Sequence, residues 1–97
     1  KVVEGSAVRS TPDRSTLRAV QTPQGFDLRT LRAANEAYFA SPQGFAATDD
    51  ASLMEWYGVT VRTVEGDPLA FKVTTPVDLL LAGALLDADA GRRKNFR

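Results

Sequence analysis

The sequence contains no cysteine and no histidine. Without cysteine these residues can form neither disulfides nor thiolate metal sites, and without histidine they lack the commonest general base and metal ligand of enzymes. A histidine-based catalytic triad and a zinc centre are therefore excluded. The seven glycines are scattered along the chain, so neither of the common glycine-rich phosphate-binding motifs is present.

Long apolar runs are missing as well. The longest lies within residues 79–86, which is too short to span a bilayer, and no charged start followed by an apolar stretch resembles a signal peptide. These features predict a cytoplasmic protein that does not enter a membrane.

An excess of charge of one sign is also absent, because 12 Lys and Arg balance 12 Asp and Glu. This balance removes the electrostatic argument for binding nucleic acid or an anionic membrane surface through the whole chain. Four basic residues lie in the last six positions, so residues 1–91 carry 8 positive and 12 negative charges, a net of 4 negative. A phosphate site must therefore be local. The four, which form a basic tail that we expect to be solvated, are Arg92, Arg93, Lys94 and Arg97.

The first 22 residues predict a β-hairpin or extended arm. Val2, Val3 and Val8 form a first extended run, and a second covers residues 16–22 after the break at Thr11-Pro12-Asp13. Neither run has a strong apolar face, which is typical of an edge element that packs against another chain.

Two helices are predicted next. The first begins at Asp27 as its N-cap and is broken by the Ser-Pro-Gln-Gly run at 41–44. The second is short, with Thr48 as its cap and Gly58 at its end.

Two strands and a final helix complete the predicted order. Residues 59–64 and 69–74 are rich in β-formers and flank a turn at 65–68. Thr75 then caps a helix that has Pro76 in its first turn and Asp78 in a capping box, and Gly91 is predicted to end it. Its apolar stripe comprises Val77, Leu80, Leu81, Ala84, Leu85 and Ala88. Two strands are too few to cover both helix stripes, so we expect apolar surface to be left over.

Several side chains have both a functional and a structural interpretation. Lys72 lies opposite the apolar face of its strand and just before a helix start, where an ammonium and backbone N–H groups together can hold a phosphate, although most such lysines simply face solvent. Asp49 and Asp50 could bind a divalent cation, but their place in a first helical turn explains them. The aromatic residues Trp56, Tyr57 and Phe71 are expected in the core rather than as a platform for stacking bases.

Three patterns, taken together, resemble the C-terminal part of the 2-C-methyl-D-erythritol 4-phosphate cytidylyltransferase family. The first is Arg14, followed eight residues later by Thr22-Pro23-Gln24-Gly25-Phe26; the second is Thr48-Asp49-Asp50-Ala51-Ser52; the third is the run Gly66-Asp67-Pro68-Leu69-Ala70-Phe71-Lys72-Val73-Thr74-Thr75-Pro76-Val77-Asp78-Leu79. The likeness covers about residues 8–86, and the order and spacing of the patterns make it specific.

The resemblance implies an α/β fold: the C-terminal part of a Rossmann-like nucleotidyltransferase domain with an extended β-arm for dimerisation. It assigns residues 1–22 to the β-arm and its return strand, 23–91 to the α/β domain, and 92–97 to the basic tail. It also implies transfer of CMP from CTP to 2-C-methyl-D-erythritol 4-phosphate in non-mevalonate isoprenoid biosynthesis, with release of pyrophosphate and Mg2+ on the triphosphate. The partners would be these two substrates, a second copy of the chain and the N-terminal part of the enzyme, with no nucleic acid and no membrane.

By position in the motifs, the resemblance assigns Arg14 and Thr22 to substrate binding and Lys72 to both substrate binding and catalysis. The glycine-rich CTP loop, the cytidine pocket and the metal-binding acid of the family are not among these residues, so no metal or cofactor ligand is expected here and the fragment is not expected to be active alone. We favour a longer enzyme cut near Lys1 over a stand-alone module. The alternatives are a cytidylyltransferase for ribitol 5-phosphate or a related polyol phosphate, and a non-catalytic dimerisation module.

Overall fold

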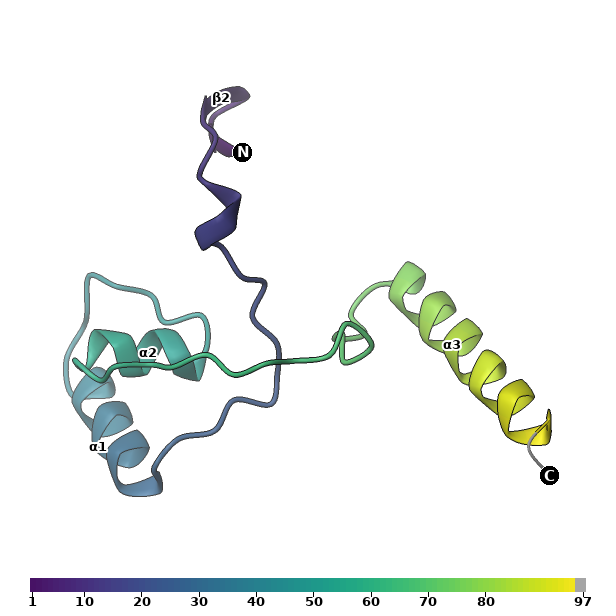
Figure 1. Ribbon diagram of the computed structural model, residues 1–97. Helices are drawn as coiled ribbons and strands as arrows, with labels where there is room; N and C mark the ends of the chain where they lie inside the picture. Colours follow the sequence, from purple (N-terminus) through teal and green to yellow (C-terminus); the bar gives the residue numbers. More distant parts are fainter. Residues whose placement is uncertain (96–97) are drawn as a thin grey trace.

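The computed structural model describes residues 1–95 and shows short elements joined by extended chain (Figure 1). It contains three α-helices and one two-stranded antiparallel hairpin, a mixed α/β composition. The elements are β1 (Val2–Glu4), β2 (Ala7–Ser10), the 3-10 helix η1 (Arg14–Thr16), α1 (Leu28–Phe39), α2 (Asp50–Trp56) and α3 (Pro76–Asn95).

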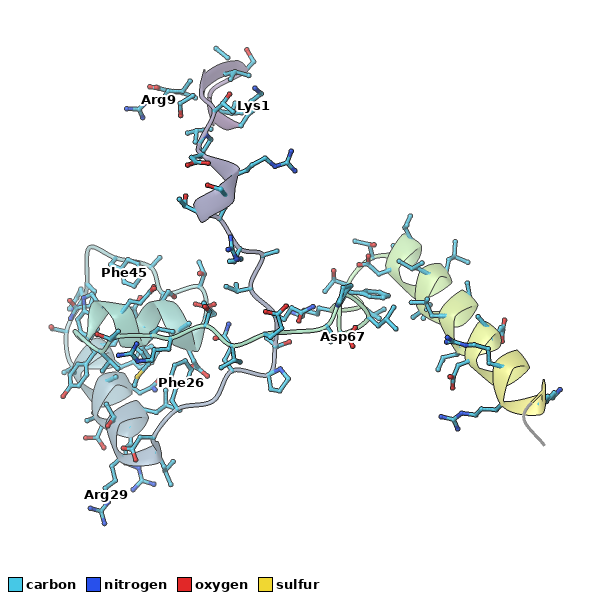
Figure 2. The ribbon with its side chains drawn as sticks, in the orientation of Figure 1. Lys1, Arg9, Phe26, Arg29, Phe45 and Asp67 are labelled. Carbon is cyan, nitrogen blue, oxygen red and sulfur yellow. The ribbon has the colours of Figure 1, made fainter. Side chains whose placement is uncertain are left out.

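The hairpin closes within the first ten residues. Val3 pairs with Val8 across the strands, and Gly5 makes the turn with a φ of +62°, which favours glycine. The second extended run predicted at residues 16–22 forms no strand among residues 1–95. The chain is diverted before that run because the Asp13 carboxylate accepts hydrogen bonds from the backbone and hydroxyl of Ser15, which starts η1. Figure 2 shows Lys1 and Arg9 on this hairpin, away from the helices.

Helices α1 and α2 pack together and form the one buried cluster of residues 1–95. Ala34 of α1 contacts Leu53 and Met54 of α2, and Phe26 packs against them from the preceding loop (Figure 2). The prediction of an aromatic core is confirmed for Trp56, whose ring meets that of Tyr38 edge to face at 5.4 Å.

The two other aromatic residues expected in the core lie outside it. Phe71 is half-buried beyond the cluster. For Tyr57 the prediction is wrong, because it is the residue after α2 and its side chain is 42% exposed.

Local capping chemistry sets the ends of these helices. Asp27 caps α1 as predicted, accepting hydrogen bonds from the backbone (3.0 Å) and hydroxyl (2.8 Å) of Thr30. The cap of α2 is Asp49 and not Thr48, because the Asp49 carboxylate reaches the backbone N–H of Ser52 and completes a capping box. Gly58 closes α2 with a φ of +93°, as predicted.

The two strands predicted at 59–64 and 69–74 do not form in this chain. These segments run as extended chain with no β-pairing, although the turn between them is present, with Ala70 N–H bonded to Asp67 O at 2.9 Å. Figure 2 shows Asp67 at this turn, just ahead of α3. A strand needs a neighbour to satisfy its backbone groups, and no segment of residues 1–95 supplies one here.

Helix α3 stands apart from every other helix and strand of the described chain (Figure 1). Thr75 caps it as predicted, but it continues through Gly91 to Asn95, so the prediction that Gly91 ends it is wrong. Gly91 is not in the left-handed region that would stop the helix, and Asp89 pairs with Arg93 at 3.0 Å and Arg92 at 3.8 Å across the last turns. Arg92, Arg93 and Lys94 therefore lie on α3, while Arg97 lies outside the described residues.

The predicted surplus of apolar surface is confirmed. Leu80 on α3 is 75% exposed, and four more aliphatic side chains of this helix are exposed: Val77, Leu79, Leu81 and Leu86. The accessible surface is 8697 Å², against about 5,400 Å² for a compact monomer of this mass. The radius of gyration is 18.9 Å, against about 13 Å for a compact domain of this length. These residues thus have an open form that further protein surface could cover.

Candidate functional site

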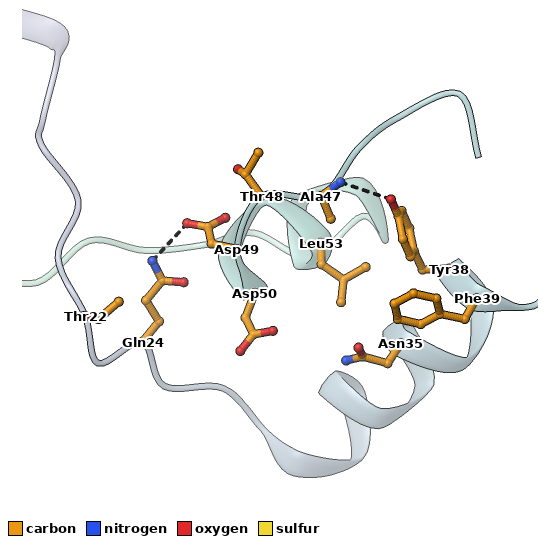
Figure 3. Close-up of a pocket in the computed structure, with 10 residues that line it drawn as sticks. All are labelled: Thr22, Gln24, Asn35, Tyr38, Phe39, Ala47, Thr48, Asp49, Asp50 and Leu53. Atoms are coloured by element: carbon orange, nitrogen blue, oxygen red, sulfur yellow. Dashed lines mark hydrogen bonds between the residues drawn. The ribbon is translucent and has the colours of Figure 1, made fainter. Parts of the chain in front are cut away.

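The corner at Thr22-Pro23-Gln24 is fixed against the start of α2 by one side chain. Gln24 donates from Nε2 to the Asp49 carboxylate at 3.0 Å (Figure 3). Its Oε1 accepts from the backbone N–H of Ala51 at 3.1 Å. The peptide bond between Thr22 and Pro23 is cis. One carboxamide therefore joins two segments that are about 25 residues apart in sequence.

The two carboxylate oxygens of Asp49 accept hydrogen bonds from different residues. Oδ1 accepts from the Ser52 backbone at 2.8 Å, and Oδ2 accepts from Gln24. The hydrogen bond from Gln24, and after it those from Ser52, lower the pKa of Asp49 below its usual value. The carboxylate is thus held in its charged form beside the corner.

An open cavity of about 400 Å³ lies between this corner, α1 and α2 (Figure 3). The polar residues that line it include Thr22, Asn35, Thr48, Asp49 and Asp50. No lysine or arginine lines it. The cavity offers hydrogen-bonding groups without positive charge, so cations for an anionic ligand must come from outside the lining.

The three predicted site residues are not brought together within residues 1–95. Thr22 lines the cavity, whereas Arg14 on η1 and Lys72 in the extended segment before α3 are exposed and do not line it. The one hydrogen bond that ties the Thr22 segment toward Lys72 runs from Gln21 Nε2 to the Asp67 carbonyl at 2.8 Å, among the described residues.

The start of α3 near Lys72 is already occupied by a carboxylate. The N–H groups of Thr74 and Thr75, which the sequence offered to a phosphate, donate to Asp78 Oδ2 at 3.1 and 2.9 Å. These hydrogen bonds, led by that from the Thr74 backbone, lower the pKa of Asp78 and keep it negative. In this form of the chain Lys72 can supply a positive charge to a phosphate, but the backbone N–H groups of Thr74 and Thr75 are already bonded to Asp78.

Two cavity residues were missed by sequence reasoning as functional candidates. Gln24 lies within one of the motifs, but the sequence predicted no role for it. Its partners Asp49 and Ala51 come close to it only when α2 is folded beside the corner. Asn35 lies on α1 and donates to Leu31 O at 2.8 Å, one helical turn back. An amide on the packed side of a predicted helix, four residues after Leu31, is the signal that could have indicated it.

The carboxylates of this portion do not make a metal centre by themselves. Within residues 1–95, no three acidic side chains lie close enough together to hold an ion. The residues described here therefore do not fit the Mg2+ that the family resemblance implies. In the same range, no helix combines the length and apolar character needed to cross a bilayer.

Comparison with known proteins places the chain among the cytidylyltransferases. The model of the 2-C-methyl-D-erythritol 4-phosphate cytidylyltransferase family matches residues 1–88, and the chain belongs to this family. The match contains all three motifs identified in the sequence.

Curated relatives carry the same name. Those from Corynebacterium efficiens and Nocardia farcinica are 66% identical over 88 residues and 59% identical over 83 residues, which is 90% and 86% of this chain and 36% and 34% of each relative. A relative from Halalkalibacterium halodurans is 50% identical over 93 residues, 96% of this chain and 40% of its own length. The chain therefore spans about a third of the length of the relatives it matches.

Proposed function

We propose that these residues are the C-terminal part of a cytidylyltransferase that transfers CMP from CTP to 2-C-methyl-D-erythritol 4-phosphate, with release of pyrophosphate. The observation that carries the proposal is the family match over residues 1–88, which includes Arg14, Thr22 and Lys72 within their motifs. The reaction belongs to non-mevalonate isoprenoid biosynthesis, and we place it in the cytoplasm.

The chemistry requires two anions to meet. A phosphate oxygen of the polyol substrate attacks the α-phosphorus of CTP in line, a new P–O bond forms, and the bond to pyrophosphate breaks. A phosphate oxygen is already a sufficient nucleophile, so no general base is needed. Cations and hydroxyl donors hold the anions and offset the charge that develops in the transition state. Arg14 and Thr22 would hold the substrate phosphate, and Lys72 would position it and offset that charge.

The exposed positions of the two cations agree with a site completed by other protein. Among residues 1–95, neither Arg14 nor Lys72 forms a hydrogen bond or an ion pair through its side chain, so both are available to a ligand. We infer that the β-arm carries Arg14 to the site of a second subunit in a homodimer. The N-terminal part of the enzyme would supply the CTP loop and most of the ligands of Mg2+.

A chimera tests this function directly. Residues 1–97 are fused after the N-terminal two thirds of the Corynebacterium efficiens relative, in place of its own C-terminal third. We expect CTP-dependent release of pyrophosphate with 2-C-methyl-D-erythritol 4-phosphate and, in a parallel assay, much slower release with ribitol 5-phosphate. A folded chimera that prefers ribitol 5-phosphate would make the alternative substrate class correct, and one inactive with both would contradict the proposal.

A second candidate is a non-catalytic dimerisation module. It is favoured by the exposed hairpin, on which Val3 and Val8 face solvent, and by a cavity without a cation in its lining. Sedimentation of the 97-residue chain by itself distinguishes the two. A stable, cooperatively unfolding dimer would favour the module, whereas a chain that aggregates without its other part would favour the enzyme fragment.

A further inference from the structure

Resting on the proposed function, we infer that Gln24 and Asp49 form a clasp that positions Thr22 for the polyol phosphate. Thr22 lies two residues before Gln24 and lines the same cavity (Figure 3). Gln24 is a positioning residue in this proposal: it acts on the substrate only through the placement of Thr22.

The clasp is more than the cap of α2. Asp49 Oδ1 and the Ser52 side chain complete the capping box between themselves, so Gln24 takes no part in that box. The second carboxylate oxygen of Asp49, Oδ2, accepts a hydrogen bond from Gln24 Nε2, and Gln24 Oε1 accepts from the Ala51 backbone. Both ends of the Gln24 carboxamide are thus used, and one of the two bonds is to a charged group, which makes it stronger than a neutral hydrogen bond.

The corner has little else to hold it. Residues 17–27 belong to no helix or strand, and apart from the packing of Phe26 the other long-range tie is the exposed hydrogen bond from Gln21 to Asp67 O. Without Gln24, Thr22 would sit on a segment free to move against α2. A displacement of about 1 Å in a substrate-binding group can lower the rate by up to about 100-fold.

The two side chains can exchange their hydrogen-bonding roles, which gives a sharp test in the chimera. Gln24→Glu places a second carboxylate against Asp49 and breaks the clasp by repulsion. The double variant Gln24→Glu with Asp49→Asn restores it with reversed polarity: the Asn amide donates to the Glu, while its oxygen still accepts from Ser52. We expect a rise of about tenfold or more in the KM for the polyol phosphate in the single variant, and recovery of most of this loss in the double variant.

The KM values separate positioning from simple loss of folded enzyme. A misplaced Thr22 raises the KM for the polyol phosphate and leaves that for CTP unchanged, whereas partial unfolding lowers kcat and changes neither KM. Gln24→Leu should act like Gln24→Glu without the added charge. Gln43→Leu is the matched control, since Gln43 is also half-buried but bonds only to Ser41 nearby; it should keep both KM values.

Hydrogen exchange at the Ala51 amide tests the clasp without any activity, because this N–H donates to Gln24. Exchange in the Gln24→Leu chimera should be at least tenfold faster than in the Gln43→Leu chimera. A chimera with no transferase activity would overturn the proposed function and leave this exchange test valid. Unchanged Ala51 exchange, an unchanged polyol phosphate KM in an active Gln24→Leu chimera, or a double variant as impaired as Gln24→Glu would each overturn the clasp.

Discussion

Thr75 and Asp78 cap α3 reciprocally: the Asp78 N–H donates to the Thr75 hydroxyl at 3.2 Å, and the Thr75 N–H donates to the Asp78 carboxylate at 2.9 Å. Asp78 also accepts from Thr74, through both its backbone and its hydroxyl. A single carboxylate therefore organises the chain between Lys72 and the first turn of α3.

This cap makes the first turn of α3 sensitive to acid. The pKa of Asp78 is lowered from 3.8, so its charged form is favoured by the fold. A group with a lowered pKa contributes stability above its unfolded pKa, and that contribution is lost as the pH falls from about 4 through the folded value. We expect the Thr74 and Thr75 amides to lose protection over this range, measured as the exchange rate relative to the intrinsic rate at each pH. Asp78→Asn keeps a hydrogen-bond acceptor but does not titrate, so the protection of Thr74 and Thr75 in this variant should not change over the same range. The same acid response in the variant as in the wild type would contradict the prediction.

Arg14 and Lys72 should complement each other across a dimer. In the chimera, Arg14→Ala and Lys72→Ala are each expected to lose activity, by at most about a thousandfold for one lost donor. If Arg14 serves the second subunit, a mixed dimer of the two variants has one intact site and one site that lacks both cations. Co-expression in equal amounts should then restore about a quarter of wild-type activity.

The control for this complementation is each variant expressed with a second copy of itself, which should stay impaired. Steady-state release of pyrophosphate is the measurement. Mixed dimers with no recovered activity would show that Arg14 acts within its own subunit, and wild-type turnover in either single variant would remove that residue from the mechanism.

Met54 is the most buried large side chain of the α1–α2 cluster, at 1% exposure. Met54→Ala should lower the free energy of unfolding of the chimera by about 2–4 kcal/mol, through lost apolar burial and the cavity left behind. Glu55→Ala is the neighbouring control, because Glu55 is exposed on the same helix. Urea denaturation gives both values, and equal midpoints for the two variants would contradict the packing described here.

Gly58 ends α2 in a conformation that side chains rarely adopt. Its φ of +93° means that Gly58→Ala introduces backbone strain although no atom stands within 4 Å of the new Cβ. We expect a loss of about 1 kcal/mol in stability. Gly44→Ala is the matched control, since Gly44 also has open space but no positive φ. A Gly44 variant as destabilised as the Gly58 variant would show that φ is not the cause.

Sequence reasoning predicted well what is local. Asp27 and the Thr75 and Asp78 pair were identified as caps because a cap is decided by side chains within three residues of the helix start. At α2 the sequence predicted Thr48 as the cap, and this prediction was wrong by one residue. The cap is Asp49, whose φ of −157° and ψ of 174° aim its carboxylate at Ser52, a backbone geometry that the sequence does not reveal.

Long-range features could not be predicted in the same way. The β-formers at 59–64 have the right composition for a strand, yet pairing depends on a neighbour that the described residues do not provide. The bond between Gln24 and Asp49 spans 25 residues and exists only because α1 and α2 pack together. The family resemblance assigned roles to Arg14 and Thr22, and it strengthened the case for Lys72, which its place before a predicted helix start had already suggested. All three roles stay predictions.

The isolation of α3 has a consequence for the fate of the polypeptide in a cell. A helix that presents Leu79, Leu80 and Leu86 to water with nothing packed on them is the kind of surface that chaperones retain and proteases degrade. When the 97-residue chain is expressed by itself, its steady-state abundance should therefore rise if a polypeptide that covers these three leucines is supplied with it.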